Sequence, residues 1–195
     1  NSEAGMTLLE KSPPDFGELR HVLGDISKDG ERAGEIIASI RSIFRAGPKA
    51  KVLVDIDEVI RDAVAILHAE LETHGIALQL NLAAGSGAPP ARILADRGQI
   101  QQVILNLAAN AIDAMAGVVG RTRTLKIVSK AGGSEGVVVS VIDTGSGIDP
   151  MVASRIFDAF VTTKPQGTGM GLAICRSLVA KHGGRLWLSS EGSPG

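Results

Sequence analysis

Two asparagines and an aspartate recur at helical spacing within the stretch QVILNLAANAIDAM, residues 102–115. Asn106, Asn110 and Asp113 are separated by four and then three residues, which places their side chains in one narrow stripe along a helix. Asparagine is a poor helix former, so two of them one turn apart require an explanation. A solvated helix face is one explanation, and a polar binding site is the other. The apolar residues lie roughly opposite the stripe, on a face suited to packing on a sheet: Ile100, Ile104, Leu107, Ala111 and Met115.

Composition limits the functions that this chain can have. It has 195 residues, of which 44% are hydrophobic and 21% charged, as in a soluble globular protein. The net charge of −1 argues against a broad nucleic-acid or membrane-surface role. No apolar run approaches the roughly 18 residues that span a bilayer, and no signal peptide is visible. The single cysteine, Cys175, lies in an apolar helical pattern and is interpreted as a packing residue, which favours a cytoplasmic setting.

The amino-terminal part is expected to form a tail, residues 1–14, followed by one long helix, residues 15–46. Asp15 and Glu18 have the spacing of a capping box, and Gly47-Pro48 ends the pattern. A helix of this length cannot bury its apolar stripe against itself, so we expect partner helices; the alternative is a helix that lies on its own domain. The stripe follows a heptad spacing: Leu19, Leu23, Ile26, Gly30, Ala33, Ile37, Ile40 and Phe44.

From Lys51 onward the pattern predicts an α+β domain, residues 52–195. The expected order is helix-strand-strand-helix-strand-strand-helix-strand, in which the second helix is the one at 97–116. This order gives a mixed β-sheet covered by helices on one face. Within it we predict an edge strand at 91–95, a short helix at 150–158 and a last strand at 185–190.

Two glycine-rich loops follow the striped helix. Asp143 stands where a strand meets Gly145 and Gly147, and a carboxylate there can accept the exocyclic amine of a purine. A tight turn explains the same pattern equally well. A second triplet, Gly167, Gly169 and Gly171, opens a helix, and amides at a helix N-terminus bind phosphate. Between the two loops, Thr162, Thr163 and Lys164 could add polar and positive groups near a terminal phosphate.

Taken together, these motifs resemble the ATP-binding domain of bacterial sensor histidine kinases, part of a superfamily shared with gyrase, Hsp90 and the mismatch-repair ATPases. NLAANAIDAM (106–115) resembles the N box and DTGSGI (143–148) the first glycine box. IFDAFVTTK (156–164) resembles the F box and GTGMGLAI (167–174) the second glycine box. The resemblance covers residues 52–195 and implies the two-layer Bergerat ATP-binding fold.

The resemblance also implies roles for individual residues. Asn110 matches the asparagine that coordinates Mg²⁺ between the phosphates, Asp143 matches the adenine-binding aspartate, and residues 158–168 match a mobile lid. ATP and Mg²⁺ are the implied cofactors. The implied ATP-binding residues are Asn106, Asn110, Asp113, Asp143, Gly145, Gly147, Ile148, Phe160, Thr163, Lys164, Gly167, Thr168, Gly169, Met170, Gly171 and Leu172.

The implied activity is transfer of the ATP γ-phosphoryl to a histidine of the dimerisation domain, and from there to an aspartate of a response regulator. The implied partners are the chain's own dimerisation helices, in a homodimer, and the regulator. Residues 15–46 resemble the second helix of such a domain. The first helix, with its phospho-accepting histidine, is not in this sequence, and the final strand is expected to be truncated. We therefore expect a fragment of a longer sensor.

Two other functions have to be distinguished from this one. The first is an ATP-driven conformational switch of the gyrase, Hsp90 and mismatch-repair class. In those relatives a glutamate that activates water stands four residues before the magnesium asparagine, and here that position is Asn106. The second is an interaction module with a degenerate pocket, against which the intact boxes argue.

Overall fold

The computed structural model describes residues 6, 16–27, 30, 34, 51–86, 90–132, 136–164 and 167–189. The chain divides into two compact units. One contains residues 1–45 together with 162–168, and the other contains residues 46–161 together with 169–195.

In the first unit, residues 16–27 form a helix, as the sequence predicts. Leu19 and Ile26 of the heptad stripe are half-buried, and Leu23 is 57% exposed. The predicted cap at Asp15 and the Gly47-Pro48 break lie outside the described residues. So do most of the tail at 1–14 and most of the heptad positions beyond residue 27.

The second unit contains two small sheets. Strands β1 (Val52–Asp55) and β3 (Arg92–Ala95) form an antiparallel pair. In the other sheet, β4 (Thr124–Ala131) lies between β2 (Ala77–Asn81), which is parallel to it, and β5 (Val137–Asp143), which is antiparallel. The predicted α+β class with a mixed sheet is therefore confirmed. The strand at 92–95 was expected at the edge of this sheet, but it pairs with β1 instead.

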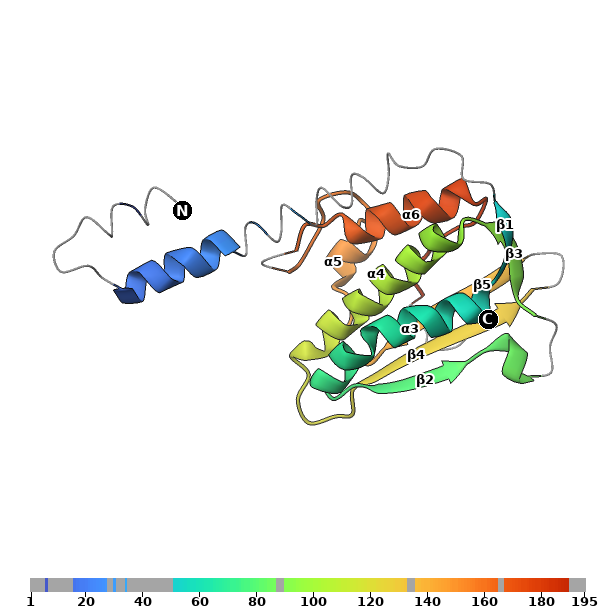
Figure 1. The fold of residues 1–195 in the computed structure, drawn as a ribbon, viewed down its shortest axis with the longest axis horizontal. Helices are drawn as coiled ribbons and strands as arrows, with labels where there is room; N and C mark the ends of the chain where they lie inside the picture. The colour runs from blue at the N-terminus through green and yellow to red at the C-terminus, as the bar shows by residue number, and fades with distance from the viewer. Residues whose placement is uncertain are drawn as a thin grey trace. The chain divides into compact units, whose positions relative to one another are not determined.

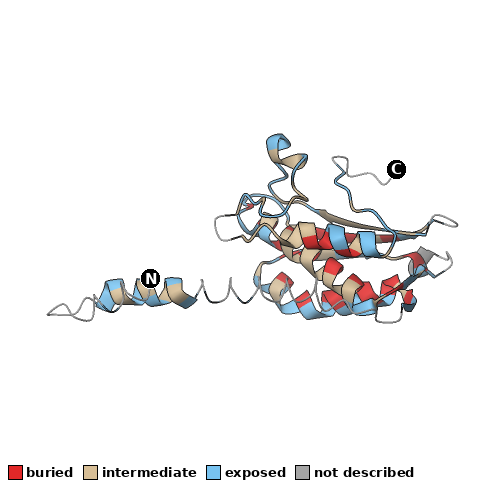
Figure 2. Cartoon of the chain, turned by 90° about the horizontal axis from the view of Figure 1, so that it is seen from above, coloured by how far each residue is buried: buried red, intermediate tan, exposed pale blue. Residues whose placement is uncertain are grey.

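Helices α3 (Ile56–Thr73), α4 (Arg97–Ala116) and α6 (Gly171–Lys181) lie together on one side of the three-stranded sheet (Figure 1). Helix α4 is the central one, packed against α3 and α6 and against β4 and β5. Figure 2 shows the buried positions in red along these helices and the exposed positions in blue. Fully buried side chains of the core include Ile56, Ile60, Ile112, Met115, Leu125 and Ile127.

Two predicted elements differ from the structure. The helix expected at 150–158 ends early, because α5 covers only Pro150–Ala153 and turns follow. None of its four residues is buried, so no packing extends it beyond one turn. The strand expected at 185–190 does not form within the described part, which ends at Ser189. An isolated strand leaves its backbone groups unsatisfied unless a neighbour pairs with it, and this segment joins neither sheet.

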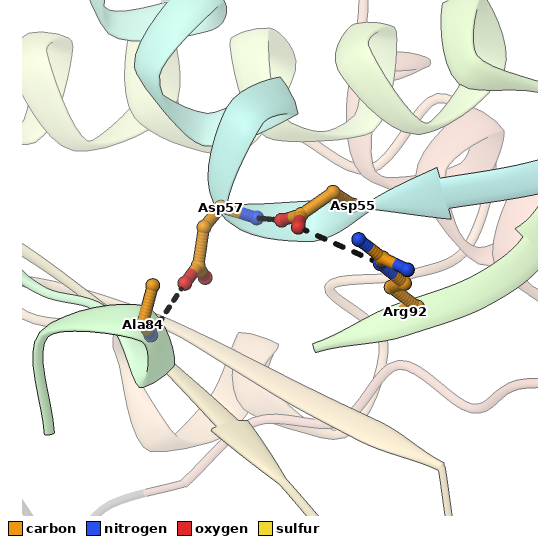
Figure 3. A network of polar contacts seen from close by, with 4 residues as sticks. All are labelled: Asp55, Asp57, Ala84 and Arg92. Carbon is orange, nitrogen blue, oxygen red and sulfur yellow. Dashed lines mark hydrogen bonds and ion pairs between the residues drawn. The ribbon is translucent and has the colours of Figure 1, made fainter. Parts of the chain in front are cut away.

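A buried aspartate connects the start of α3 with β4 and with the short 3₁₀ helix η1 (Ala83–Ser86). Asp57 is 1% exposed. Its carboxylate accepts the Ala84 N–H at 2.8 Å and the hydroxyl of Ser129. The preceding Asp55 caps the helix by accepting the Asp57 N–H at 3.0 Å, and it pairs with Arg92 at 3.9 Å (Figure 3). The bonds from Ala84 and Ser129 satisfy the Asp57 carboxylate, whose burial without partners would be unfavourable.

Among the residues that the structure describes, no helix is long and apolar enough to cross a membrane.

Candidate functional site

The polar stripe of α4 lies on the side of the helix away from the core. Asn106 and Asn110 are half-buried and Asp113 is exposed, whereas Ile104, Ala111 and Met115 on the opposite side are buried. The amphipathic helix at 97–116 is therefore as predicted. It begins at the N-cap Asp96, whose carboxylate accepts the N–H groups of Gly98 and Gln99 at 2.9 and 3.2 Å.

The first glycine loop packs on the carboxyl-terminal end of this stripe. Asp143 ends β5, and its Oδ1 accepts the Gly145 N–H at 2.8 Å. Ser146 donates its N–H to the Ala114 carbonyl of α4 at 3.2 Å. A β-carbon on Gly145 would lie 2.8 Å from both the Cβ and the carbonyl oxygen of Ala114. Glycine is therefore required for this close approach, which brings the loop next to Asp113.

Two side chains outside the predicted set hold this loop. The hydroxyl of Thr144 accepts the Thr124 N–H at 2.9 Å and donates to the Thr122 carbonyl at 3.1 Å. The guanidinium of Arg121 donates to the carbonyl of Gly145. The loop is therefore fixed to the start of β4 as well as to α4.

The second glycine box meets the middle of the stripe. Helix α6 begins at Gly171, where the nearest atom to an added β-carbon would be the Nδ2 of Asn110, at 3.8 Å. The backbone amides at the start of α6 therefore lie beside the predicted magnesium ligand. This arrangement combines a helix N-terminus, which favours anions, with a carboxamide that can supply an oxygen to a hard cation.

The loop between the two glycine boxes is closed at its base by Phe160 and Gly169. Phe160 donates its N–H to the Gly169 carbonyl at 3.0 Å. Both residues have positive φ, +68° for Phe160 and +65° for Gly169, and Phe160 is 76% exposed. A β-carbon on Gly169 would lie 2.5 Å from the backbone carbonyl carbon of Phe160. A non-glycine residue at φ +68° is strained, and such strain concentrates at functional segments.

We expect Gly169→Ala to open the base of this loop and to weaken nucleotide binding much more than Gly147→Ala. Gly147 also has positive φ, +78°, but an added β-carbon there meets nothing within 4 Å. A backbone cost of roughly 1–2 kcal/mol is therefore common to both variants. At Gly169 a backbone clash adds about 1–3 kcal/mol. Titration calorimetry with an ATP analogue checks this, and equal losses in the two variants would contradict it.

Residues Thr163, Lys164, Gly167 and Thr168 belong by position to the first compact unit. Inside that unit the Thr162 hydroxyl accepts the Lys164 N–H at 3.1 Å, and Gly167 donates to the Lys164 carbonyl at 3.1 Å. Their part in a nucleotide site stays a prediction from the sequence. Of the other predicted residues, Ile148 is 41% exposed, and Met170 and Leu172 are half-buried at the start of α6.

Cys175 is fully buried between α6 and α4, which confirms its interpretation as a packing residue. Burial raises the pKa of its thiol to about 11, an effect that a hydrogen bond from the Asn106 side chain reduces in part. The thiol also lies 3.9 Å from the Val103 carbonyl. Asn106 of the stripe is thus held toward α6, a contact that helical spacing alone does not reveal.

Residues 95–195, which contain the stripe and both glycine boxes, match the family model for the histidine kinase-, DNA gyrase B- and HSP90-like ATPases. The chain belongs to this family.

Curated relatives of this chain include a sensor histidine kinase and another sensor protein. The chain is 37% identical over 197 residues to the sensor histidine kinase TmoS of Ectopseudomonas mendocina, covering 100% of this chain and 20% of TmoS. It is 35% identical over 188 residues to the sensor protein FixL of Bradyrhizobium diazoefficiens, covering 96% of this chain and 36% of FixL. The chain thus spans between a fifth and about a third of the length of these relatives.

Solved structures similar to this chain are also those of histidine kinases. The nucleotide-free catalytic domain of histidine kinase ThkA has a TM-score of 0.61 and 32% identity, covering 71% of this chain and 86% of that chain. Full-length ShkA in complex with AMPPNP has a TM-score of 0.65 and 28% identity, covering 92% of this chain and 37% of that chain. These relatives favour the sensor kinase branch of the family over its gyrase and chaperone branches.

Proposed function

We propose that this chain is the ATP-binding catalytic part of a sensor histidine kinase, which binds Mg-ATP along the α4 stripe and donates its γ-phosphoryl to a histidine of a dimerisation domain. One observation carries the proposal. The predicted magnesium ligand Asn110, the start of α6 at Gly171 and the Gly145 loop lie on the same side of one helix. The complex of ShkA with AMPPNP supports an adenine nucleotide as the ligand.

Each group has a chemical role in this arrangement. Asp143 accepts the exocyclic amine of adenine, and Gly145 allows the ring to approach the backbone. The amides at the start of α6 receive phosphate oxygens. A magnesium ion, when bound, would neutralise charge on the phosphates, and the half-buried carboxamide of Asn110 fits such an ion because its oxygen is a hard, neutral ligand.

Phosphoryl transfer requires positioning more than covalent chemistry from the protein. The stripe offers Asn106 where a hydrolytic enzyme needs a base, and a carboxamide cannot take a proton from water at neutral pH. Bound ATP is therefore preserved for a better nucleophile. We propose that this nucleophile is a histidine on the dimerisation helices, that residues 15–46 are the second of those helices, and that a response-regulator aspartate receives the phosphoryl group next.

The test is phosphoryl transfer between separate proteins. The chain is incubated with γ-labelled Mg-ATP, alone and together with the dimerisation and phosphotransfer helices of TmoS. We expect acid-labile label on the helices only when both proteins are present. A histidine-to-glutamine variant of those helices is the control. Comparable labelling of the chain alone, on His21, His68, His74 or His182, would contradict the proposal.

A further inference from the structure

Helices α4 and α6 are joined at three levels along their length. Near the proposed nucleotide site, Gly171 faces Asn110. In the middle, the Cys175 thiol lies 3.9 Å from the Val103 carbonyl. At the far end, the ring of His182 accepts a hydrogen bond from the N–H of Asp96 at 3.0 Å. The order of these contacts shows that the two helices are antiparallel and that the His182 contact lies about 21 Å along α4 from Asn110.

The two hydrogen bonds of His182 define its protonation. His182 is the C-cap residue of α6, and the Nδ1 of its ring lies 2.8 Å from the Leu178 carbonyl oxygen. A carbonyl only accepts, so Nδ1 carries the proton. A backbone N–H only donates, so Nε2 of the same ring must be unprotonated to accept from Asp96. These partners assign His182 as a neutral imidazole in its Nδ1–H tautomer.

The partner of this imidazole is the residue that starts α4. Asp96 is the N-cap of α4. Its carboxylate accepts the N–H groups of Gly98 and Gln99, and its carbonyl accepts the Ile100 N–H at 3.1 Å. The hydrogen bond that Asp96 donates to His182 therefore ties the ring to the first turn of the helix that carries the polar stripe. The same bond connects the carboxyl-terminal end of α6 to the start of α4, at the opposite end of the helix pair from the contact of Gly171 with Asn110.

Three charged side chains surround this junction. The Asp96 carboxylate caps α4, the exposed Lys181 adjoins His182, and the Lys51 ammonium donates to the Lys181 carbonyl at 3.2 Å. A second proton on His182 would point an N–H at the Asp96 N–H and force the ring to turn. It could then pair with the Asp96 carboxylate through Oδ2, because Oδ1 accepts the amides of Gly98 and Gln99, but its bond with the Asp96 N–H would be lost.

We propose that His182 is a positioning residue for the nucleotide site, whose neutral ring holds α6 in register with α4 and whose protonation releases that register. This inference rests on the proposed function, because it assigns a pH-dependent regulation to the same site. Loss of one neutral hydrogen bond is expected to change nucleotide affinity by about three- to tenfold.

The experiment is calorimetric titration of the whole chain with Mg-AMPPNP at a series of pH values from about 8 down to about 6. The nucleotide affinity of the unaltered chain should fall toward the lower pH, and this fall should be about three- to tenfold larger than the fall in the His182→Gln variant. Glutamine keeps a donor and an acceptor but does not titrate. His182→Leu should bind weakly at both ends of this range. Titration of the nucleotide itself is common to all variants and cancels in the comparison.

The matched control is His74→Gln. His74 is the C-cap of α3, and its Nδ1 makes the same contact with the Glu70 carbonyl at 2.9 Å. Its Nε2 has no hydrogen bond to any residue that the structure describes, so this substitution should leave the pH dependence unchanged.

Reciprocity gives a second measurement on the unaltered protein. If protonation of His182 weakens nucleotide binding, then saturating nucleotide must make the ring harder to protonate by the same factor. Nuclear magnetic resonance of the imidazole nitrogens measures this even if His182→Leu fails to fold. Identical titration with and without nucleotide, or an equal pH dependence in His182→Gln, would overturn the inference alone. Failure of the unaltered chain to bind at about pH 8 would overturn the proposed function, and the inference with it.

Discussion

Replacing Asn106 with glutamate is expected to raise the rate of phosphate release from Mg-ATP by about a hundredfold or more, because general-base assistance contributes roughly 10²–10⁴ in rate. The unaltered chain should hydrolyse ATP negligibly. Its stripe places a carboxamide four residues before Asn110, and a carboxamide can hold a water without accepting its proton. Steady-state phosphate release at saturating Mg-ATP measures both rates.

The nearest other carboxylate of the stripe does not replace this base. Asp113 lies about one turn beyond Asn110, on the side away from Asn106, and it is exposed beside the first glycine loop. Asn106→Gln is the matched control, since it lengthens the side chain by one methylene without adding a base. It should leave phosphate release as slow as in the unaltered chain.

A different outcome would change the assignment of function. Turnover typical of an ATPase in the unaltered chain would contradict the kinase proposal and support an ATP-driven conformational switch. An equal acceleration by Asn106→Gln would show that disturbing the contact between Asn106 and Cys175, rather than adding a base, releases the activity.

The second large effect is expected at Asp143. Asp143→Asn should weaken adenine-nucleotide binding by about 10- to 100-fold, because a hydrogen bond to a charged group contributes about 1.5–3 kcal/mol. In the structure one carboxylate oxygen accepts the Gly145 N–H, which an asparagine oxygen can also accept. The other oxygen would be replaced by an amide that points a donor at the adenine amine, itself a donor.

Asp149→Asn is the matched control for this substitution. Asp149 is also exposed, follows the same loop and accepts a backbone N–H, that of Met151, at 2.8 Å. It therefore tests the general loss of one negative charge near the loop. Calorimetry should show a loss of affinity for Asp143→Asn alone, with a smaller preference for adenine over guanine nucleotides. Unchanged affinity in both variants would mean that the adenine pocket lies elsewhere.

Features that depend on neighbouring residues in the chain could be predicted from the sequence. The helix at 97–116 follows from an apolar period of 3.6 residues, which any packing partner would satisfy, and the stripe of Asn106, Asn110 and Asp113 follows from the same period. The glycine loop after Asp143 likewise depends on contacts within two or three residues. Four motifs in order then supplied the family, which the comparisons confirmed.

Features that depend on how distant segments pack could not be predicted. The segment at 185–189 alternates like a strand, but a strand forms only beside a neighbour with matching register. Neither of the two sheets includes this segment. Phe160 has a positive φ at the point where its N–H bonds to the carbonyl of Gly169, nine positions away in the sequence. The contact of Asp96 with His182 joins residues 86 positions apart, and that of Val103 with Cys175 joins residues 72 apart. Local periodicity assigns each helix its buried face, whereas the axial register between two helices is set by packing and by these few polar contacts.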